Sequence, residues 1–181
     1  HLHNAGCEVT VTCLGDPATA SPDATASRAR ARAAGVAFAE SPPSQWDLCI
    51  DALLGIGATR PPEGVMAEWI HRMQGAAAPV LAIDNPTGLN ADTGEAAAVC
   101  VKARATLSLL TLKPGLFTAD GRDMAGQVWL DDLQVDLGGL AKPQAPTAFL
   151  LARPASAMRR HASHKGSYGD VAIVGGARGL T

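Results

Sequence analysis

The sequence predicts an α/β protein built around a mainly parallel β-sheet. Segments with strand composition alternate with segments of helical spacing, which is the pattern of β-α-β units. One candidate strand, Pro79–Ile83, is entirely apolar, as is typical of strands buried in a parallel sheet. Glycine-rich and acidic loops follow the candidate strands. Ligands of such sheets bind beyond the carboxyl ends of the strands, so these loops are the first place to look for a site.

Length and composition exclude several classes of protein. The chain has 181 residues, of which 47% are hydrophobic and 18% charged, so it is globular, with room for one domain and part of another. The net charge of −2 argues against nucleic-acid binding, and no apolar run approaches the roughly 20 residues of a membrane span. We therefore expect a small-molecule substrate and neither a nucleic-acid nor a membrane partner.

The cysteines indicate the cellular compartment, and the chain ends indicate whether the sequence is a fragment. Four scattered cysteines without CxxC spacing indicate neither a disulfide framework nor a zinc site, which favours a reducing cytoplasm. The chain starts at His1 without a signal-peptide pattern and stops at Thr181 soon after a strand-like segment. We expect both ends to be truncated. We also expect a homo-oligomer.

The first third of the chain predicts one strand and one helix. Leu2–Gly6 is typical of a helix end closed by glycine, and β-branched residues favour a strand within Cys7–Leu14. Asp23–Ala34 has helical composition and is followed by Gly35, a common helix terminator.

The middle of the chain predicts the sheet. Leu48–Leu54 is a buried strand interrupted by one charge, Asp51, and an amphipathic helix is expected over Glu63–Gln74. Three apolar residues at helical spacing should face the core from that helix: Val65, Trp69 and Met73. Further strands are predicted over Pro79–Ile83, Ala105–Leu110 and Gln127–Leu130.

The loop after the Leu48–Leu54 strand is a candidate ligand loop. Its glycines allow a ligand to approach the backbone closely, although a plain turn explains them equally well. It fails as a dinucleotide fingerprint, because the third glycine would fall at Arg60. Arg60 could pair with a phosphate or lie on the surface. The loop reads Gly55-Ile56-Gly57-Ala58-Thr59-Arg60-Pro61.

Two acidic residues mark the expected carboxyl edge of the sheet. Asp84 directly follows an apolar strand, where a carboxylate is either a turn-former or a catalytic group. Asp51 lies within an apolar run and needs a cation or several hydrogen-bond donors. Oxygens of Asp51 and of Thr87 could together hold a hard cation such as potassium. Lys113, after the Ala105–Leu110 strand, either brings a positive charge to the same crevice or belongs to a surface turn.

Three motifs in order resemble the NAD(P)H-hydrate epimerase family, the YjeF N-terminal-type domain. They are Asp51–Gly57, Ala82–Leu89, and Thr106-Leu107 together with Lys113–Leu116. The resemblance spans about residues 1–136 and implies a Rossmann-like three-layer sandwich with a mainly parallel sheet.

The last stretch resembles the opening of an ADP-dependent NAD(P)H-hydrate dehydratase domain. The motif runs from His164 to Asp170, followed by the apolar segment Val171–Val174 and the glycine-rich turn Gly175–Gly179. This likeness implies the first strand of a ribokinase-like domain. We therefore expect an epimerase domain over 1–140, a linker over 141–150 and an incomplete dehydratase domain over 151–181.

The resemblance also assigns roles to individual residues. The loop from Gly55 to Pro61 would contact the hydrated nucleotide, and Asp84 would contact its reacting part and act as the catalytic residue. Asp51 and Thr87 would bind potassium, although the family more often has serine at the position of Thr87. The family's Asn-Gly-Gly-Asp-Gly loop is absent from this chain.

The implied activity is repair of hydrated NADH and NADPH. The epimerase would interconvert the R and S hydrates, and the fused domain would dehydrate the S form with ADP and Mg²⁺. The fragment by itself is expected to be inactive. Two alternatives remain, an NAD-dependent oxidoreductase of Rossmann type and a non-catalytic nucleotide-binding module.

Overall fold

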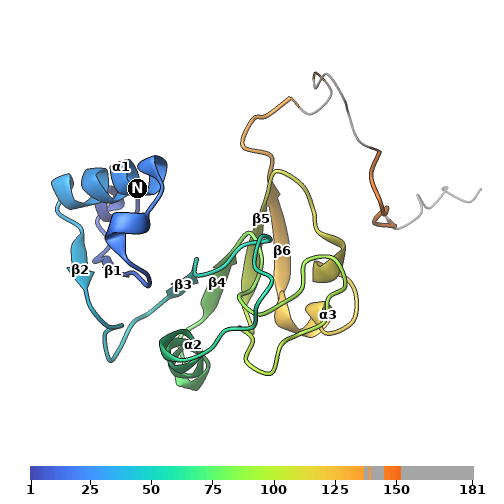
Figure 1. The fold of residues 1–181 in the computed structure, drawn as a ribbon, viewed down its shortest axis with the longest axis horizontal. Helices are drawn as coiled ribbons and strands as arrows, with labels where there is room; N and C mark the ends of the chain where they lie inside the picture. Colours follow the sequence, from blue (N-terminus) through green and yellow to red (C-terminus); the bar gives the residue numbers. More distant parts are fainter. Residues whose placement is uncertain (137–138, 140–144, 152–181) are drawn as a thin grey trace, which may run out of the picture. The chain divides into compact units, whose positions relative to one another are not determined.

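A computed structural model describes residues 1–136, 139 and 145–151 of the chain (Figure 1). The chain divides into two compact units, His1–Gln144 and Ala145–Thr181. All helices and strands of the described residues lie in the first unit. The expected dehydratase strand Val171–Val174 and residues 141–144 of the expected linker lie outside the described residues. None of the described helices is long and apolar enough to cross a membrane.

The amino-terminal part forms a small parallel sheet and one helix. Strand β1 (Thr10–Thr12) pairs with β2 (Ala37–Ala39), a strand that the sequence patterns did not predict. Helix α1 (Pro22–Ala33) begins where the Ser21 hydroxyl accepts a hydrogen bond from the backbone N–H of Ala24. The helix ends before Gly35, whose φ of 86° suits glycine, as predicted.

The site is built on a second sheet of four parallel strands. Their spatial order is β3-β4-β5-β6, which is also their order along the chain (Figure 1). Helix α2 (Val65–Gly75) connects β3 to β4, and the short helix α3 (Gly121–Met124) precedes β6. The predicted parallel α/β class is therefore confirmed. The strands are β3 (Cys49–Asp51), β4 (Val80–Ile83), β5 (Ala105–Leu109) and β6 (Gln127–Asp131).

One face of this sheet carries the core. Asp51, Ala82, Thr106 and Val128 pair across the four strands and therefore share that face. Helix α2 and the segment before β5 pack on it in a cluster of buried apolar side chains. On the opposite face Trp129 is 57% exposed. The cluster contains Ile70, Met73, Val80, Ala82, Val101 and Ala103.

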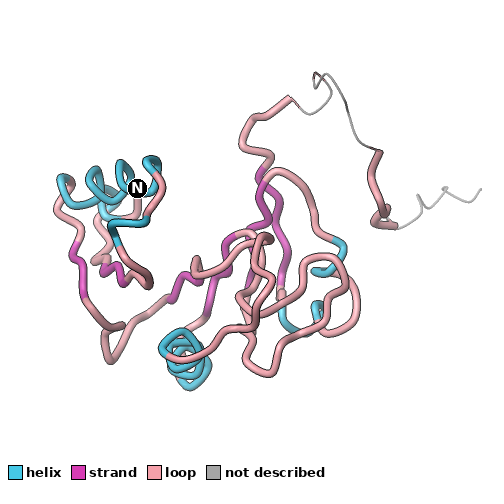
Figure 2. Tube along the Cα trace, viewed as in Figure 1, coloured by secondary structure: helices cyan, strands magenta, loops and turns pink. Residues whose placement is uncertain are grey.

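The connection between β4 and β5 is a long loop instead of a helix (Figure 2). It is held by a bridge between Leu89 and Ala96 and by the backbone N–H of Val101, which donates to the Thr87 carbonyl over 2.8 Å. A side chain at Gly88 would lie 2.4 Å from the Val99 carbonyl oxygen, so the loop folds back tightly on itself. The site residues that follow β4 are fixed by this folded loop.

Two expectations from the sequence need correction. Strand β3 ends at Asp51, so this carboxylate lies at the carboxyl edge of the sheet and not inside the strand. The predicted core residue Val65 is 52% exposed, because it is the first residue of α2 and precedes the buried Trp69, Ile70 and Met73.

Truncation of Ile70 should destabilise the first unit strongly. Ile70 is 1% exposed at the centre of the core, so Ile70→Ala should lower the free energy of unfolding by about 2–5 kcal/mol. Val65→Ala on the same helix should change it by about 0.5 kcal/mol or less. Urea denaturation followed by circular dichroism measures both. Equal losses would show that Ile70 is not a core residue.

Candidate functional site

The carboxyl edge of the four-stranded sheet gathers the polar residues predicted from sequence. Asp51 ends β3, Asp84 follows β4, and Ser108 lies near the end of β5. The strands are parallel, so these ends open on one edge. Lys113 reaches the same edge from the turn after β5, which supports the crevice alternative over the surface turn.

The predicted pair Asp51 and Thr87 is in direct contact. The Thr87 hydroxyl donates to Asp51 Oδ1 over 2.7 Å, and the Thr87 backbone N–H donates to Oδ2 over 2.8 Å. The backbone N–H of Leu53 donates to Oδ1 over 3.2 Å, and that of Leu54 donates to Thr87 Oγ1 over 3.1 Å. Asp51, which is 1% exposed, therefore joins the end of β3 to the loop after β4.

The Asp51 carboxylate is buried, and the groups that donate to it carry no positive charge. Burial raises the pKa of this carboxyl above its ordinary value, and the hydrogen bonds from Thr87 and Leu53 lower it only in part. Its hydrogen-bond donors within the described residues are all neutral groups. Three donors occupy three of about four acceptor positions on the carboxylate, and Thr87 Oγ1 also keeps one lone pair. The pair fits a hard cation, which binds oxygen ligands, without completing its shell.

Asp84 is held at both its backbone and its side chain. Its φ of 71° is left-handed, and its backbone N–H donates to the Leu107 carbonyl of β5 over 2.7 Å. The backbone N–H of Ile56 donates to Asp84 Oδ2 over 3.3 Å. A Cβ on Gly55 would lie 3.0 Å from the same oxygen. Asp84 thus faces the loop Gly55–Pro61, the position expected from the sequence.

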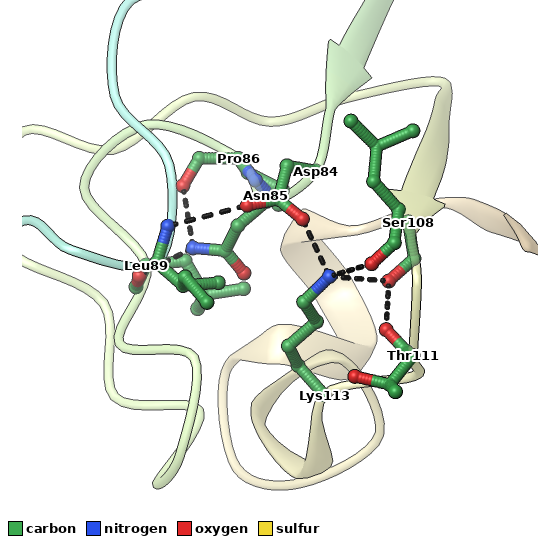
Figure 3. Close-up of polar contacts among 9 residues, drawn as sticks. Asp84, Asn85, Pro86, Leu89, Ser108, Thr111 and Lys113 are labelled. Atoms are coloured by element: carbon green, nitrogen blue, oxygen red, sulfur yellow. Dashed lines mark hydrogen bonds and ion pairs between the residues drawn. The ribbon is translucent and has the colours of Figure 1, made fainter. Parts of the chain in front are cut away.

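The other oxygen of Asp84 meets a buried ammonium group (Figure 3). Lys113 Nζ lies 2.5 Å from Asp84 Oδ1, and the Lys113 side chain is 8% exposed. The same nitrogen donates to Ser108 Oγ and to the Leu109 carbonyl. The ion pair joins the turn after β5 to the end of β4.

A cavity of about 220 Å³ lies beside these groups. Of the predicted ligand loop, Gly55 and the stretch Ala58–Pro61 line it, whereas Ile56 and Gly57 do not. Asp84 stands behind Gly55 and is not part of the cavity wall, and neither are Asp51 and Thr87. The opposite wall comes from the β4–β5 loop, mainly Asn85, Gly88, Asn90 and Glu95.

Sequence reasoning missed part of this wall and part of the Lys113 environment. Asn85 is buried, and its Nδ2 donates to the Leu89 carbonyl over 2.6 Å, which shapes the loop. Ser108 is fully buried on β5. The signal for both was a polar residue within or next to an apolar strand, the same signal that singled out Asp51.

This arrangement is that of a Rossmann-like α/β domain, which binds its ligand at the carboxyl edge of a parallel sheet. The family model described as YjeF-related protein N-terminus matches residues 1–115. That match covers more than half of the chain, and the chain belongs to this family.

The chain is also similar to curated proteins of this kind. It is 40% identical over 146 residues to the bifunctional NAD(P)H-hydrate repair enzyme of Leishmania braziliensis, covering 76% of this chain and 26% of that protein. It is 37% identical over 140 residues to the bifunctional NAD(P)H-hydrate repair enzyme Nnr of Escherichia coli, a match that covers 76% of this chain and 27% of that protein. It is 38% identical over 133 residues to the NAD(P)H-hydrate epimerase of Limosilactobacillus fermentum, a match that covers 72% of this chain and 64% of that protein. The chain thus spans about a quarter of the two bifunctional relatives.

The buried Asp51 carboxyl should make stability depend on pH. The folded state raises its pKa above the ordinary 3.8, so the folded state binds the proton more tightly than the unfolded chain does. The contribution of Asp51 to stability is therefore fully present below 3.8 and is lost as the pH rises through the folded pKa. Asp51→Asn removes this loss, so the stability of the wild type relative to the variant should fall with rising pH. Urea denaturation between about pH 4 and pH 8 measures it. A constant difference over that range would contradict the raised pKa.

Proposed function

We propose that the protein acts in nicotinamide nucleotide repair and epimerises the R and S forms of hydrated NADH and NADPH. The observation that carries the proposal is Asp84. It is held at the edge of the sheet against the Gly55–Ile56 backbone, beside a cavity lined by the rest of that loop. Family membership and the names of the relatives supply the substrate class.

The chemistry requires a group that moves a proton. In the hydrate, the hydroxyl sits on a ring carbon that also bears the ring nitrogen. When Asp84 takes the hydroxyl proton, a C=O bond forms, the C–N bond breaks, and its electron pair stays on the nitrogen, which takes up a second proton from solvent. Reclosure on the other face returns both protons and inverts the centre. Loss and return of the hydroxyl as water also needs proton transfer, a contribution of about 10²–10⁴-fold.

Substrate would occupy the cavity beside Asp84. Gly55 and the stretch Ala58–Pro61 would contact it, with Ile56 and Gly57 completing the loop. Arg60 is the cationic side chain in that wall and is suited to a phosphate of the nucleotide. The wall from the β4–β5 loop, with its apolar and amide groups and the Glu95 carboxylate, would face the rest of the molecule.

Potassium would be held by Asp51 and Thr87, which each retain an acceptor position. A bound cation supplies positive charge next to the buried carboxylate and so holds the end of β3 against the loop after β4. If this is right, potassium should flatten the pH dependence predicted above for Asp51, whereas tetramethylammonium at equal ionic strength should not. We further propose that a fused domain of the complete gene product dehydrates the S hydrate with ADP and Mg²⁺. The protein would act in the cytoplasm.

The test supplies the R hydrate of NADH to the complete gene product together with a separately purified dehydratase specific for the S hydrate. Recovery of NADH then requires epimerisation. Chromatography that separates the two hydrates gives the rate directly. No conversion beyond the spontaneous rate would overturn the proposed function. Reduction of a substrate by NADH, with no epimerisation, would favour the oxidoreductase alternative.

Asp84→Asn should abolish the proton-transfer group while keeping the shape. Epimerisation should fall about 10²-fold or more, because an amide cannot accept and return a proton as a carboxylate does. Binding of the hydrate, measured by calorimetry, should change by less than about threefold. Dehydration of pure S hydrate serves as the control and should persist. An unchanged epimerisation rate would reduce Asp84 to a turn residue.

Gly55→Ala should disturb Asp84 without unfolding the domain. The added Cβ would lie 3.0 Å from Asp84 Oδ2, and Lys113 restrains the carboxylate from moving away. Misplacement on this scale should lower kcat about tenfold or more. Gly75→Ala is the matched control, because its Cβ meets nothing within 4 Å and lies at the end of α2. Equal kcat values for the two variants would contradict the contact.

A further inference from the structure

The buried ammonium group of Lys113 has no donor to spare. A lysine ammonium has three N–H donors. Three acceptors surround Nζ: Asp84 Oδ1 at 2.5 Å, the Leu109 carbonyl at 2.6 Å and Ser108 Oγ at 3.2 Å. The residue is 7% exposed, so water does not replace any of them easily. Lys113 therefore acts on what it already touches and is not placed to donate to a substrate.

The turn around Lys113 is shaped to present these acceptors. The single hydroxyl proton of Ser108 goes to the Thr111 carbonyl over 2.9 Å, so Ser108 Oγ turns its lone pairs toward Nζ (Figure 3). The Leu109 carbonyl accepts from Lys113 and also from the Thr111 backbone N–H at 2.7 Å. Leu110 between them has a φ of 64°, an uncommon backbone conformation for leucine. With Leu110 in this conformation, the Leu109 carbonyl accepts from Lys113 and the Thr111 carbonyl accepts from Ser108.

These contacts give the two carboxylate oxygens of Asp84 different surroundings. Oδ1 is bound to Lys113, whereas the one hydrogen bond that the described residues give Oδ2 is the long 3.3 Å bond from the Ile56 backbone. Oδ2 is also the oxygen that lies against Gly55 of the ligand loop. A carboxylate free to rotate would exchange these positions.

We propose that Lys113 is a positioning residue for epimerisation, which fixes Asp84 Oδ1 so that Oδ2 exchanges the proton with the substrate hydroxyl. The inference rests on the proposed function and names a residue for it. The proton passes from the hydroxyl to Oδ2 and is returned after the centre inverts, while Lys113 keeps its own protons throughout. An ion pair whose lysine is buried adds little net stability compared with apolar residues of similar size, so its placement on this carboxylate favours a role in the reaction.

The experiment is a double-mutant cycle on the epimerisation rate of the complete gene product. Lys113→Met keeps the length and removes the ammonium. It should lower kcat about 10²-fold with KM changed by less than about threefold, because misplacement of a reacting group by about 1 Å costs on this order. In the Asp84→Asn background the same substitution should lower kcat by less than about threefold, because the group it positions is already gone.

Two further variants separate positioning from folding. Ser108→Ala removes one acceptor of Nζ without touching Asp84, and should lower kcat several-fold in the wild type but not in the Asp84→Asn background. If Lys113→Met does not fold, the Ser108→Ala measurements test the proposal instead. Thr106→Val is the matched control: Thr106 lies on the same strand and is equally buried, but its hydroxyl donates to the Ala125 carbonyl and not to the Lys113 group. It should lower the free energy of unfolding while kcat stays within about twofold.

The outcomes distinguish the two proposals. A wild-type protein that does not epimerise overturns the proposed function, and this inference with it. An active wild type in which Lys113→Met keeps kcat within threefold overturns the inference alone. A Lys113→Met loss that is undiminished in the Asp84→Asn background would also overturn it, because Lys113 would then act independently of Asp84.

Discussion

Two charged groups, Asp51 and Lys113, are buried at the carboxyl edge of one sheet, and the loops around them are shaped by the need to satisfy those charges. An unpaired charge inside a protein costs several kcal/mol, about the whole margin of stability of a small domain. Asp51 accepts hydrogen bonds from the backbone and hydroxyl of Thr87 in the loop after β4 and from the backbone of Leu53, just beyond β3. Lys113 is satisfied by a carboxylate, a hydroxyl and a carbonyl. The ends of β3, β4 and β5 are thereby tied together.

The same contacts explain why this edge departs from ordinary backbone geometry. Asp84 and Leu110 both have positive φ, and each stands directly after its strand. Asp84 turns its carboxylate back toward Gly55, and Leu110 turns the chain so that the Leu109 and Thr111 carbonyls face inward. Strain of this kind persists only where the surroundings fix it, and here the fixing groups are hydrogen bonds to buried charges. The result is a carboxylate held in one position next to the cavity.

The long loop between β4 and β5 replaces the helix that usually crosses between parallel strands. Its turns are closed by the Leu89–Ala96 bridge and by backbone hydrogen bonds, and Gly88 allows it to approach Val99. The loop supplies both the Thr87 hydroxyl that meets Asp51 and one wall of the cavity. One irregular segment therefore both contacts the buried charge and lines the cavity.

Local sequence signals were enough for the parallel class, for α1 with its Gly35 terminator, and for the positions of β4, β5 and β6. Apolar strands and helix-capping residues report short-range physics, so they can be recognised without tertiary contacts. Asp51 and Asp84 were also found from sequence, because charges beside apolar strands are rare. Strand β2 escaped notice, because its three residues carry little pattern of their own and the strand exists only through pairing with β1.

The sequence by itself determined which chemistry this edge can offer: two carboxylates, a hydroxyl and a lysine, each next to a candidate strand. Only the tertiary structure decided their partners. It placed Thr87 on Asp51, turned Asp84 toward Gly55, and used all three donors of Lys113. The physical reason is that a residue's type and neighbours along the chain fix its charge and hydrogen-bonding capacity. The partners that join one strand end to the next are 28 to 36 positions away and are brought into contact only by the pairing of parallel strands.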